Sequence, residues 1–465
     1  MLQSANAANH TQHAPTLRGI PAAPSVHWLL KGAPSLKVGE MHQYFLQCHR
    51  SLGDIVDLNL PFSRVIVIGS PALAKELLTA RHGDYRKDFA TRTLSLALGN
   101  GLLTSEGSFW AKQRRIAQPA FKKSHLAQLA NLMVEATDAL LSQWESRASD
   151  PLNISEEMHH LTASIAAKTL FGYDPSDVSA FGPFSKALHS NMTFISNRFG
   201  SLVKAPSWLP IPSHLRFFKN QRLLDRQIFQ FIEDRKQSGR QAADLLGMLL
   251  ESKDEDTGAQ MTPQQLRDEC MTLFAAGQET SGNGLAWTMM YLAQHDQYRQ
   301  QVRAEVKSVL ANAHPRYEDL QNLPFLKQVV EESMRLRPPA WAIGREAIRD
   351  TELGEYRIPK GAQVLVSIYT LHLRGDIWES PENFQPERFS KEETAKRARF
   401  SYLPFGAGPR MCIGNHFAMM EMQLALAMIV QRFDFEMESA HSLKGETRIT
   451  LRPETSMKMN LKQIA

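Results

Sequence analysis

The order of secondary-structure patterns along the chain predicts a mainly α-helical protein with a smaller β-rich part. Helical periodicity dominates from Phe109 to about Arg337, and strand patterns occur only before and after that stretch. No internal repeat and no linker divides the chain. Its 465 residues can bury a substantial core and still enclose a ligand, so we expect a single large domain over residues 18–465.

The N-terminal part of the chain contains the first predicted strands. Residues 1–17 are rich in Ala, Asn, Gln and His, and we expect them to be disordered. The strands over residues 55–60 and 64–68 are joined across Pro61-Phe62-Ser63, which predicts a hairpin. The start of the chain has no signal-peptide pattern, and no apolar run approaches the ~20 residues that span a bilayer. We therefore expect neither secretion nor a membrane anchor.

The central stretch shows a clear buried helix face. Mostly apolar residues recur three and four positions apart, at Leu126, Leu129, Met133, Thr137, Leu140 and Trp144. The prolines between residues 206 and 212 exclude a regular helix there. A further helix is predicted to begin near Thr262-Pro263, because a threonine followed by a proline is a typical helix start.

Strand patterns return after Pro338. Residues 356–358 and 363–369 flank a turn at residues 359–361. Residues 449–451 with residues 457–461 predict a late hairpin.

The composition is that of an ordinary globular protein. Apolar residues make up 43% and charged residues 22% of the chain. The net charge of +5 and the pI near 9.0 indicate mild basicity, and no basic tract is long enough to favour nucleic-acid binding. The three cysteines, Cys48, Cys270 and Cys412, cannot form a disulfide framework, which favours a reducing compartment.

One glycine-rich loop carries the clearest chemistry. Its ten residues, Phe405-Gly-Ala-Gly-Pro-Arg-Met-Cys-Ile-Gly414, place Cys412 just before a strongly helix-forming stretch. A lone cysteine is usually a small buried hydrophobe. Here the helix N-terminus should favour the thiolate, and Gly406 and Gly408 should let the backbone turn sharply and approach a flat partner. A thiolate there, with Arg410 as a neighbouring cation, is what haem iron with a sulfur axial ligand requires.

This loop resembles the cysteine-ligand signature Phe-x-x-Gly-x-Arg-x-Cys-x-Gly of the cytochrome P-450 family. Every specified position matches, at Phe405, Gly408, Arg410, Cys412 and Gly414. The resemblance implies the family's fold, a large helical body with a smaller β-rich lobe, and a bound haem b. It further implies that Cys412 is the proximal iron ligand and that Arg410 contacts a haem propionate. Phe405 and Gly414 are implied to adjoin the haem.

A second motif lies inside a predicted helix. Gly277 in mid-helix costs about 1 kcal/mol relative to alanine, so a close packing contact or a ligand should need it. The segment 276–280, Ala-Gly-Gln-Glu-Thr, resembles the family's distal-helix motif Ala/Gly-Gly-x-Asp/Glu-Thr. The resemblance implies that Ala276 and Gly277 adjoin the haem and that the helix widens locally. It also implies that Thr280 and Glu279 deliver protons during oxygen activation.

Glu332 and Arg335 stand three residues apart on one predicted helix face. Such a pair is normally exposed and contributes roughly a few tenths of a kcal/mol. The segments 332–335, Glu-Ser-Met-Arg, and 386–389, Pro-Glu-Arg-Phe, resemble two further elements of the family. The resemblance implies that Glu332, Arg335 and Arg388 form a buried salt-bridged triad that supports the cysteine loop.

Three more residues are implied to hold the haem propionates. Trp110 and Arg114 lie one helical turn apart, where surface packing is the plain alternative. The phrase from Trp110 to Phe121 resembles the family's propionate-binding helix, and Arg345 matches another propionate-binding arginine. His372 departs from the family pattern, because the arginine that usually follows the histidine is displaced by one residue.

The motifs together predict a haem-thiolate monooxygenase. It would use O2 as co-substrate and insert one oxygen atom into an apolar small molecule, most often by hydroxylation. A haem sensor or electron carrier would have no use for the pair Glu279-Thr280. A peroxygenase or an isomerase-like relative of the same fold commonly replaces the threonine. A peroxygenase or isomerase-like protein stays the alternative function. A comparison of NADH-driven with peroxide-driven turnover would distinguish it from a monooxygenase.

The resemblance also implies a separate electron donor. The chain has no flavin or iron–sulfur motif, so we expect a ferredoxin or flavodoxin-type donor with its NAD(P)H reductase. Basic residues that the resemblance places around the proximal face would form the docking surface, with a solvated charge run as the alternative. They are Lys112, Arg115, Lys122, Lys123, Lys396, Arg397 and Arg399. Eukaryotic family members usually carry an N-terminal anchor, so the absence of one predicts a cytoplasmic, bacterial protein.

The sequence leaves the substrate open among fatty acids, terpenoids, steroids and polyketide-like molecules. Positional analogy places mainly apolar segments around the pocket, namely 91–103, 192–199, 273–280, 339–343 and 455–457. The pocket residues expected from them are Leu98, Phe194, Leu273, Ala276, Ala340, Trp341 and Ser456.

Overall fold

A computed structural model of the chain describes residues 18–23, 38–60, 63–147, 150–173, 178–200, 209–238, 244–439, 444–454 and 456–464. The predicted disordered segment 1–17, Pro61 and Phe62 of the expected hairpin turn, and residues 206–208 of the proline-rich stretch lie outside the described residues. The described part of the chain is mainly helical, as the sequence predicts.

The helices and strands follow the predicted order in outline, but four α-helices precede residue 109, where only strands were expected, and a two-residue strand lies within the predicted helical stretch. The α-helices are α1 (Met41–Leu52), α2 (Pro71–Lys75), α3 (Phe89–Thr93), α4 (Ser95–Leu98), α5 (Gly107–Ala117), α6 (Lys123–Ser146), α7 (Ile154–Phe171), α8 (Val178–Gly200), α9 (Pro212–Ser238), α10 (Leu245–Glu251), α11 (Pro263–Gln294), α12 (Asp296–Leu310), α13 (Pro324–Leu336), α14 (Ile368–His372), α15 (Lys391–Lys396) and α16 (Asn415–Arg432). Shorter helical turns include η2 (Glu76–Ala80), η4 (Gln118–Phe121), η6 (Pro386–Phe389) and η7 (Gly408–Arg410). The strands are β1 (Ile55–Asp57), β2 (Val65–Ile68), β3 (Tyr85–Lys87), β4 (Leu152–Asn153), β5 (Ala342–Ala347), β6 (Thr351–Leu353), β7 (Tyr356–Ile358), β8 (Gln363–Ser367), β9 (Phe433–Met437), β10 (Gly445–Thr447), β11 (Leu451–Pro453) and β12 (Lys458–Gln463).

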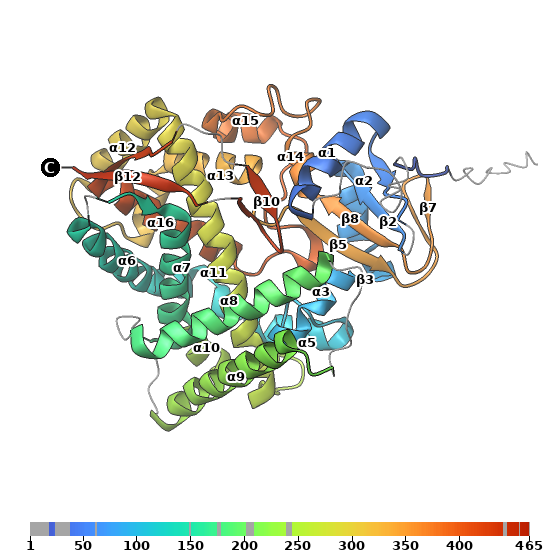
Figure 1. Cartoon of the computed structure of the whole chain (residues 1–465), viewed down its shortest axis with the longest axis horizontal. Coiled ribbons are helices and arrows are strands. Elements are labelled where there is room, and N and C mark those ends of the chain that lie inside the picture. The colour runs from blue at the N-terminus through green and yellow to red at the C-terminus, as the bar shows by residue number, and fades with distance from the viewer. Residues whose placement is uncertain are drawn as a thin grey trace, which may run out of the picture.

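The long helix α11 runs through the middle of the molecule and organises the helices around it (Figure 1). It packs against α7, α9, α13 and α16. The helices α6 and α12 lie on one side of α11, and the main sheet lies on the other (Figure 1). The helices α8 and α9 pack side by side along the edge of the body. This arrangement is the expected helical body with a smaller β-rich lobe.

The helix α11 begins where the sequence predicts. The Thr262 hydroxyl accepts the backbone N–H of Gln265 at 3.2 Å, and the Gln265 side chain accepts the backbone N–H of Thr262 at 2.7 Å. This reciprocal capping box, with Pro263 at the first helical position, accounts for N–H groups that have no partner inside the helix. The predicted buried face of α6 is also confirmed, because each of its residues is buried.

The main sheet has five strands in the order β1-β2-β8-β5-β3. The strands β1 and β2 form the predicted antiparallel hairpin, with Ile55 opposite Ile68, and β8 joins β2 in parallel. The strands β7 and β8, which flank the predicted turn at residues 359–361, belong to different sheets. After Ser367 the chain turns into α14, so the predicted strand over residues 363–369 ends earlier than expected.

The late hairpin predicted from residues 449–451 and 457–461 is wrong. The strand β11 instead pairs antiparallel with β10, whereas β12 pairs with β9 and with β4. Short segments of alternating apolar residues suit several partners. Their pairing is therefore decided by the strand that the folded body brings alongside.

Two features bear on the expected cellular setting. All three cysteines are free, and Cys48 and Cys270 are buried. Within the described ranges, no helix is both long enough and apolar enough to cross a membrane.

A buried ion-pair network joins α13 to the segment that leads into the cysteine loop. The Arg335 guanidinium donates to both carboxylate oxygens of Glu332, at 2.6 and 2.8 Å, and both side chains are wholly buried. Its other N–H groups donate to three backbone carbonyls between residues 372 and 383. Arg388 of η6 lies 3.5 Å from the Glu332 carboxylate, so the structure brings the predicted triad together.

His372 extends this network toward the cysteine loop. Its Nδ1–H donates to the Arg335 carbonyl at 3.2 Å, and its Nε2 accepts the backbone N–H of Leu403 at 2.9 Å. Burial lowers the pKa of His372 to about 3, so the ring is neutral. The histidine is a structural link between α13 and the segment before the loop.

Removal of the Glu332 carboxylate should destabilise the whole fold. Glu332→Ala leaves Arg335 as a buried charge without a carboxylate partner, and such a loss costs about 3–5 kcal/mol. The free energy of unfolding in urea, followed by circular dichroism, should fall accordingly. The control Glu393→Ala removes the partner of the exposed Lys396 and should cost less than about 1 kcal/mol. Equal losses in the two variants would contradict a supporting role for the triad.

Candidate active site

The cysteine loop turns sharply and presents Cys412 two residues before Gly414, the N-cap of α16. Gly406 and Gly408 both have a φ of +70°, the left-handed conformation that favours glycine, so the predicted sharp turn is confirmed. A Cβ added at Gly408 would lie 1.9 Å from the carbonyl oxygen of Leu78. Packing against η2 therefore requires glycine at this position, independently of any approach to a flat partner.

The Cys412 thiol is surrounded by protein but accessible from a cavity that it lines. Burial raises the pKa of the Cys412 thiol, against the opposing effects of the Gly414 backbone N–H, which hydrogen-bonds the sulfur, and of the Arg114 charge. The expected preference for the thiolate is thus not supplied by the helix N-terminus alone. A bound metal ion, which deprotonates a coordinating thiol, would supply it.

A cavity of about 380 Å³ adjoins this sulfur, between the cysteine loop and α11. Its walls also include parts of α5, α7, β5 and α16, which are far apart in the sequence. All of the residues predicted to adjoin the cofactor line this one cavity, namely Trp110, Arg114, Ala276, Gly277, Arg345, Phe405, Arg410, Cys412 and Gly414.

Four cations line the cavity. Arg114, Arg345 and Arg410 were predicted, and the structure adds Lys87 of β3. Burial lowers the pKa of each of them, to about 7 for Lys87 and to about 10 for Arg410. The charges of Arg345 and Arg410 also lower the pKa of Lys87, and those of Glu106 and Asp88 oppose the shift. A cluster of like charges in a partly desolvated cavity is suited to anionic groups of a ligand.

Contacts within the protein orient two of these cations. The Arg410 guanidinium donates to the Ser105 carbonyl at 2.8 Å and to the Glu106 carboxylate at 2.6 Å, and it lies 3.8 Å from the centroid of the Trp110 ring. Arg114 donates to a backbone carbonyl of the cysteine loop at 2.8 Å. Both residues therefore tie α5 and the segment before it to the cysteine loop.

The donor set fits haem b. The cavity offers one sulfur, a group of cations and largely apolar walls, which correspond to the iron, the two propionates and the macrocycle of a haem. No cluster of three His, Cys, Asp or Glu side chains that could hold another metal ion occurs in the part of the chain that the structure describes. His372 does not line the cavity, so the propionate role that the sequence left open is not supported.

The helix α11 presents Gly277 and Thr280 to the cavity. A Cβ added at Gly277 would meet no atom outside its own helix within 4 Å, so the glycine keeps space open and does not serve a packing contact. The Thr280 hydroxyl donates to the Ala276 carbonyl at 2.6 Å, a back-bond of the kind that often bends helices. The helix is α-helical without interruption from Pro263 to Gln294, and the expected local widening is not present as a break.

Glu279 faces a different side of α11 from Thr280. It lines a second pocket, of about 260 Å³, between α7, α8, α11 and the turn from β10 to β11, and it does not line the main cavity. The Thr450 hydroxyl donates to the Glu279 carboxylate at 2.5 Å, and the Asn283 side chain donates to Thr450 at 3.0 Å. Two neighbouring residues of α11 therefore reach two separate pockets.

Sequence reasoning missed two titratable residues of the cavity, Lys87 and Glu421. Glu421 is buried on α16, its Oε2 has no hydrogen-bond partner among the described residues, and burial raises its pKa to about 8. A signal was present, since Glu421 is the single acidic residue of a helix that is otherwise mostly apolar. Lys87 had no comparable signal, because it lies in a three-residue polar strand.

The predicted substrate-pocket residues divide into two groups. Those that line the cavity are Leu273, Ala276 and Ala340. The structure places Leu98, Phe194, Trp341 and Ser456 outside its lining. Leu98 is buried behind the cavity wall, and Ser456 is exposed just before β12.

Phe194 and Trp341 turn toward other elements. The Phe194 ring packs on Phe217 of α9, with ring centroids 4.8 Å apart. The Trp341 ring packs on Phe45 of α1 at 5.7 Å and donates its indole N–H to the Arg448 carbonyl at 3.3 Å. The segment 339–343 around Trp341 lines the cavity as predicted, whereas the segment 192–199 around Phe194 lines the second pocket instead. The directions of the two rings depend on the packing of α1 and α9.

The chain is similar to proteins of one family along nearly its whole length. A family model described as "Cytochrome P450" matches residues 21–460. Cyclooctatin synthase of Streptomyces melanosporofaciens is 32% identical over 97% of this chain and 95% of its own. Cyclooctat-9-en-7-ol 5-monooxygenase of the same species is 31% identical over 84% of each chain. A cytokinin hydroxylase of Arabidopsis thaliana is 32% identical over 84% of this chain and 77% of its own.

Solved structures agree with the observed fold. The haem domain of cytochrome P450DA matches with a TM-score of 0.88 and 26% identity, over 97% of this chain and 98% of that chain. The similarity covers both the helical body and the β-rich lobe.

Replacement of Cys412 should change the ligand of the iron. Reduced protein with carbon monoxide is expected to show the red-shifted Soret band of thiolate-ligated haem, and Cys412→His should remove it, because an imidazole replaces the sulfur. Cys48→Ala and Cys270→Ala should keep the band, because both side chains are buried away from the cavity lining. A Cys412→His protein that retained the band would show that another residue binds the iron.

Proposed function

The chain belongs to the cytochrome P450 family and is a monooxygenase of that family, and we propose that it inserts one oxygen atom from O2 into an apolar small molecule, by hydroxylation. The observation that carries the proposal is the cavity in which Cys412 on one wall and Gly277 with Thr280 on another face the same space. The relatives include proteins named as a monooxygenase and as hydroxylases.

The residues of the cavity have distinct roles in this proposal. Haem b, when bound, supplies the chemistry of oxygen activation and oxygen transfer. Cys412 would bind its iron through sulfur, and the four cations that line the cavity, with Trp110 stacked on Arg410, would hold its propionates. The largely apolar walls would keep bulk water away from the reacting centre.

We assign proton delivery to Thr280 and Glu279. The Thr280 hydroxyl lines the cavity and can hold or pass a proton at Oγ1. The Glu279 carboxylate lines the second pocket, so it can exchange protons on the other side of α11. The hydrogen bond from Thr450 fixes the carboxylate in that position.

The cavity supports an apolar substrate. Its lining includes the apolar side chains of Leu102, Leu103, Leu273 and Ile343. Apolar ligand surface that these side chains remove from water stabilises binding by about 25 cal/mol per Å². One relative is named for oxidation of cyclooctat-9-en-7-ol. We propose a substrate of comparable character, mostly hydrocarbon with few polar groups.

A binding and turnover experiment tests the function. The haem-loaded protein is titrated with cyclooctat-9-en-7-ol, a cytokinin, a fatty acid and a steroid, and a productive probe should shift the haem spectrum from low to high spin. Turnover of that probe with NADPH, a ferredoxin and its reductase under ¹⁸O2 should give a product that carries one ¹⁸O atom. Turnover with hydrogen peroxide, and none with NADPH, would contradict the proposal and favour a peroxygenase.

We further propose that an acidic ferredoxin or flavodoxin docks beside the cysteine loop. Phe121 lies 3.8 Å from the Cβ position of Gly414, so the exposed Lys122 and Lys123 that follow it stand next to the loop. Neither lysine is in an ion pair within the described residues. Free cations near the haem ligand suit electrostatic steering of an acidic donor.

Some of the basic residues predicted for this surface are engaged elsewhere. Arg115 is paired with Asp254 and with Asp256, at 2.9 and 3.0 Å. The Arg397 guanidinium lies 4.3 Å from the centroid of the Phe389 ring. The docking proposal therefore depends on Lys122 and Lys123 and not on Arg115.

Loss of the Thr280 hydroxyl should uncouple electron use from product formation. Thr280→Ala removes the group that passes protons in the cavity but changes little volume, so probe binding should change modestly. NADPH consumption should continue, product per NADPH should fall about fivefold or more, and hydrogen peroxide should rise to match. Assays of NADPH, product and peroxide in one reaction measure this ratio.

Thr280→Ser is the matched control, because it restores a hydroxyl at the same position. It should recover most of the coupling. If Thr280→Ala forms as much product per NADPH as the parent protein, proton delivery runs through another group.

Charge reversal next to the cysteine loop should slow electron transfer. Lys122→Glu combined with Lys123→Glu should lower the rate of the first electron transfer from an acidic ferredoxin about tenfold at low ionic strength. The difference should shrink as salt shortens the Debye length toward about 8 Å at physiological ionic strength. Stopped-flow reduction under carbon monoxide gives the rate. Lys236→Glu, on the exposed C-terminal end of α9, is the control, and an equal effect of this change would contradict docking at the lysine pair.

A further inference from the structure

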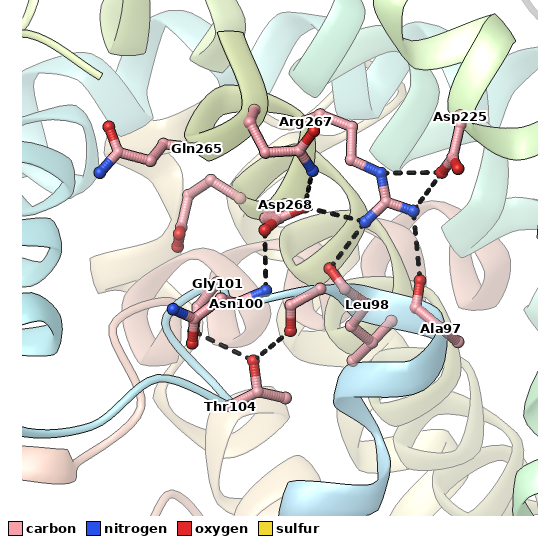
Figure 2. Close-up of polar contacts among 12 residues, drawn as sticks. Ala97, Leu98, Asn100, Gly101, Thr104, Asp225, Gln265, Arg267 and Asp268 are labelled. Carbon is pink, nitrogen blue, oxygen red and sulfur yellow. Dashed lines mark hydrogen bonds and ion pairs between the residues drawn. The ribbon is translucent and has the colours of Figure 1, made fainter. Parts of the chain in front are cut away.

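A buried arginine outside the lining of the cavity joins three elements of the molecule (Figure 2). Arg267, in the N-terminal part of α11, is 4% exposed. Its Nε donates to Asp225 of α9 at 2.9 Å, and its Nη2 also contacts that carboxylate. Its Nη1 donates to the Leu98 carbonyl at 3.1 Å and to Asp268 at 3.0 Å, and Nη2 donates to the Ala97 carbonyl at 3.3 Å. All five N–H groups of the guanidinium therefore have partners.

The next two residues of α11 hold the same loop. Asp268 Oδ2 accepts the backbone N–H of Asn100 at 2.8 Å (Figure 2). The Glu269 carboxylate accepts the backbone N–H of Leu102 at 3.1 Å. Residues 97–104, which are the last two residues of α4 and the loop after it, are here called the wall loop, and they are tied to three consecutive residues of α11.

Two glycines permit this close approach. A Cβ added at Gly99, which has a φ of +78°, would lie 2.2 Å from Asp268 Oδ1. A Cβ added at Gly101 would lie 2.2 Å from Thr272 Oγ1. The Thr104 hydroxyl closes the wall loop by donating to the Gly99 carbonyl at 2.6 Å. The wall loop is therefore shaped for contact with this part of α11.

The wall loop connects the cavity with α9. Its residues Leu102 and Leu103 line the cavity. At its other end, the Gln221 side chain of α9 donates to the Ala97 carbonyl at 3.0 Å and to Asp225 at 3.1 Å. The wall loop, α9 and α11 consequently meet at Arg267.

Arginine is suited to this position, where the wall loop, α9 and α11 meet. Its planar fork presents five donors in fixed directions, whereas a lysine ammonium at the same place could not serve two carboxylates and two carbonyls at once. A buried ionic network of this kind is weak evidence for stability, but removal of one partner leaves an uncompensated charge. The Asp225 side chain is 37% exposed while that of Arg267 is 4% exposed, so the contact between Arg267 and α9 is the one that solvent can reach.

We propose that Arg267 is a positioning residue that fixes the cavity wall and couples it to α9. Movement of α9 away from α11 would remove the Asp225 carboxylate from the Arg267 guanidinium. The hydrogen bonds from that guanidinium to the wall loop would then have to rearrange. Because Leu102 and Leu103 of the wall loop line the cavity, movement of α9 would alter that wall, and the entry of a bulky molecule should respond to it. The proposal uses haem binding as a spectroscopic signal and does not depend on the proposed monooxygenase chemistry.

The test compares Arg267→Lys and Asp225→Asn with a matched control in the haem-loaded protein. Arg299→Lys is the control, because Arg299 is also buried, contacts two carboxylates, Asp296 and Asp434, and lines neither pocket. Stopped-flow spectroscopy measures the association of 4-phenylimidazole, a bulky haem ligand, and of cyanide, a small one. Hydrogen–deuterium exchange with mass spectrometry measures the opening of the wall loop independently of the haem.

We expect both Arg267→Lys and Asp225→Asn to speed 4-phenylimidazole association about tenfold, as the loss of about one charge-assisted hydrogen bond would. Both should increase exchange in peptides that contain residues 97–104. Cyanide association should stay unchanged, and the two substitutions together should add little to either alone, because both break the same contact. Arg299→Lys should behave as the parent protein in each measurement.

Other results would overturn the proposal. Parent-like association and exchange in Arg267→Lys would remove the positioning role. If Asp225→Asn loosens α9 without faster exchange in residues 97–104, the coupling between the two elements is absent. An equal effect of Arg299→Lys would assign the change to general destabilisation. Asp225→Asn is nearly isosteric at a partly exposed position, so it carries the test even if Arg267→Lys does not fold.

Discussion

The fork between Arg335 and Glu332 is the interaction on which the active site depends. It is wholly buried, and its spare donors hold backbone carbonyls of the segment that leads to the cysteine loop. His372 connects this network to the cysteine loop. Its Nε2 accepts the backbone N–H of Leu403, and the Leu403 carbonyl accepts the backbone N–H of Gly406. The turn that presents Cys412 thus begins from a segment held by a charge network, so the position of the sulfur depends on that network.

The same physical device occurs twice with different consequences. Arg335 and Arg267 each use all five donors, which arginine can do because its fork is rigid. The carboxylate partner of Arg335, Glu332, is wholly buried, and this network supports the segment that leads to the cysteine loop. One partner of Arg267, Asp225, is partly exposed on α9, so one side of this network is accessible to solvent. The two arginines make the same type of bonds. What differs is the burial of the carboxylate partner, which is complete for Arg335 and partial for Arg267.

The cations around the cavity suit a ligand with anionic groups, such as the propionates of haem b. Burial lowers the pKa of Lys87, Arg345 and Arg410, so holding these cations in the cavity costs free energy. Anionic groups of a ligand would offset that cost. On another wall, Thr280 faces the cavity and Glu279 faces the second pocket. At this point α11 therefore lies between the cavity and the pocket that holds the proposed proton source, with one polar residue facing each.

The sequence by itself determined the family, the cysteine loop and the nine residues predicted to adjoin the cofactor, because these features depend on the spacing of residues within short segments. The glycine turn, the start of α11 and the cavity-facing Thr280 follow from such local patterns. Only the tertiary structure decided that Glu279 faces a second pocket, that Trp341 turns away from the cavity and that Lys87 joins the cations. It also decided that β11 pairs with β10. Side-chain direction and strand pairing depend on which distant elements pack together, and no local spacing encodes that choice.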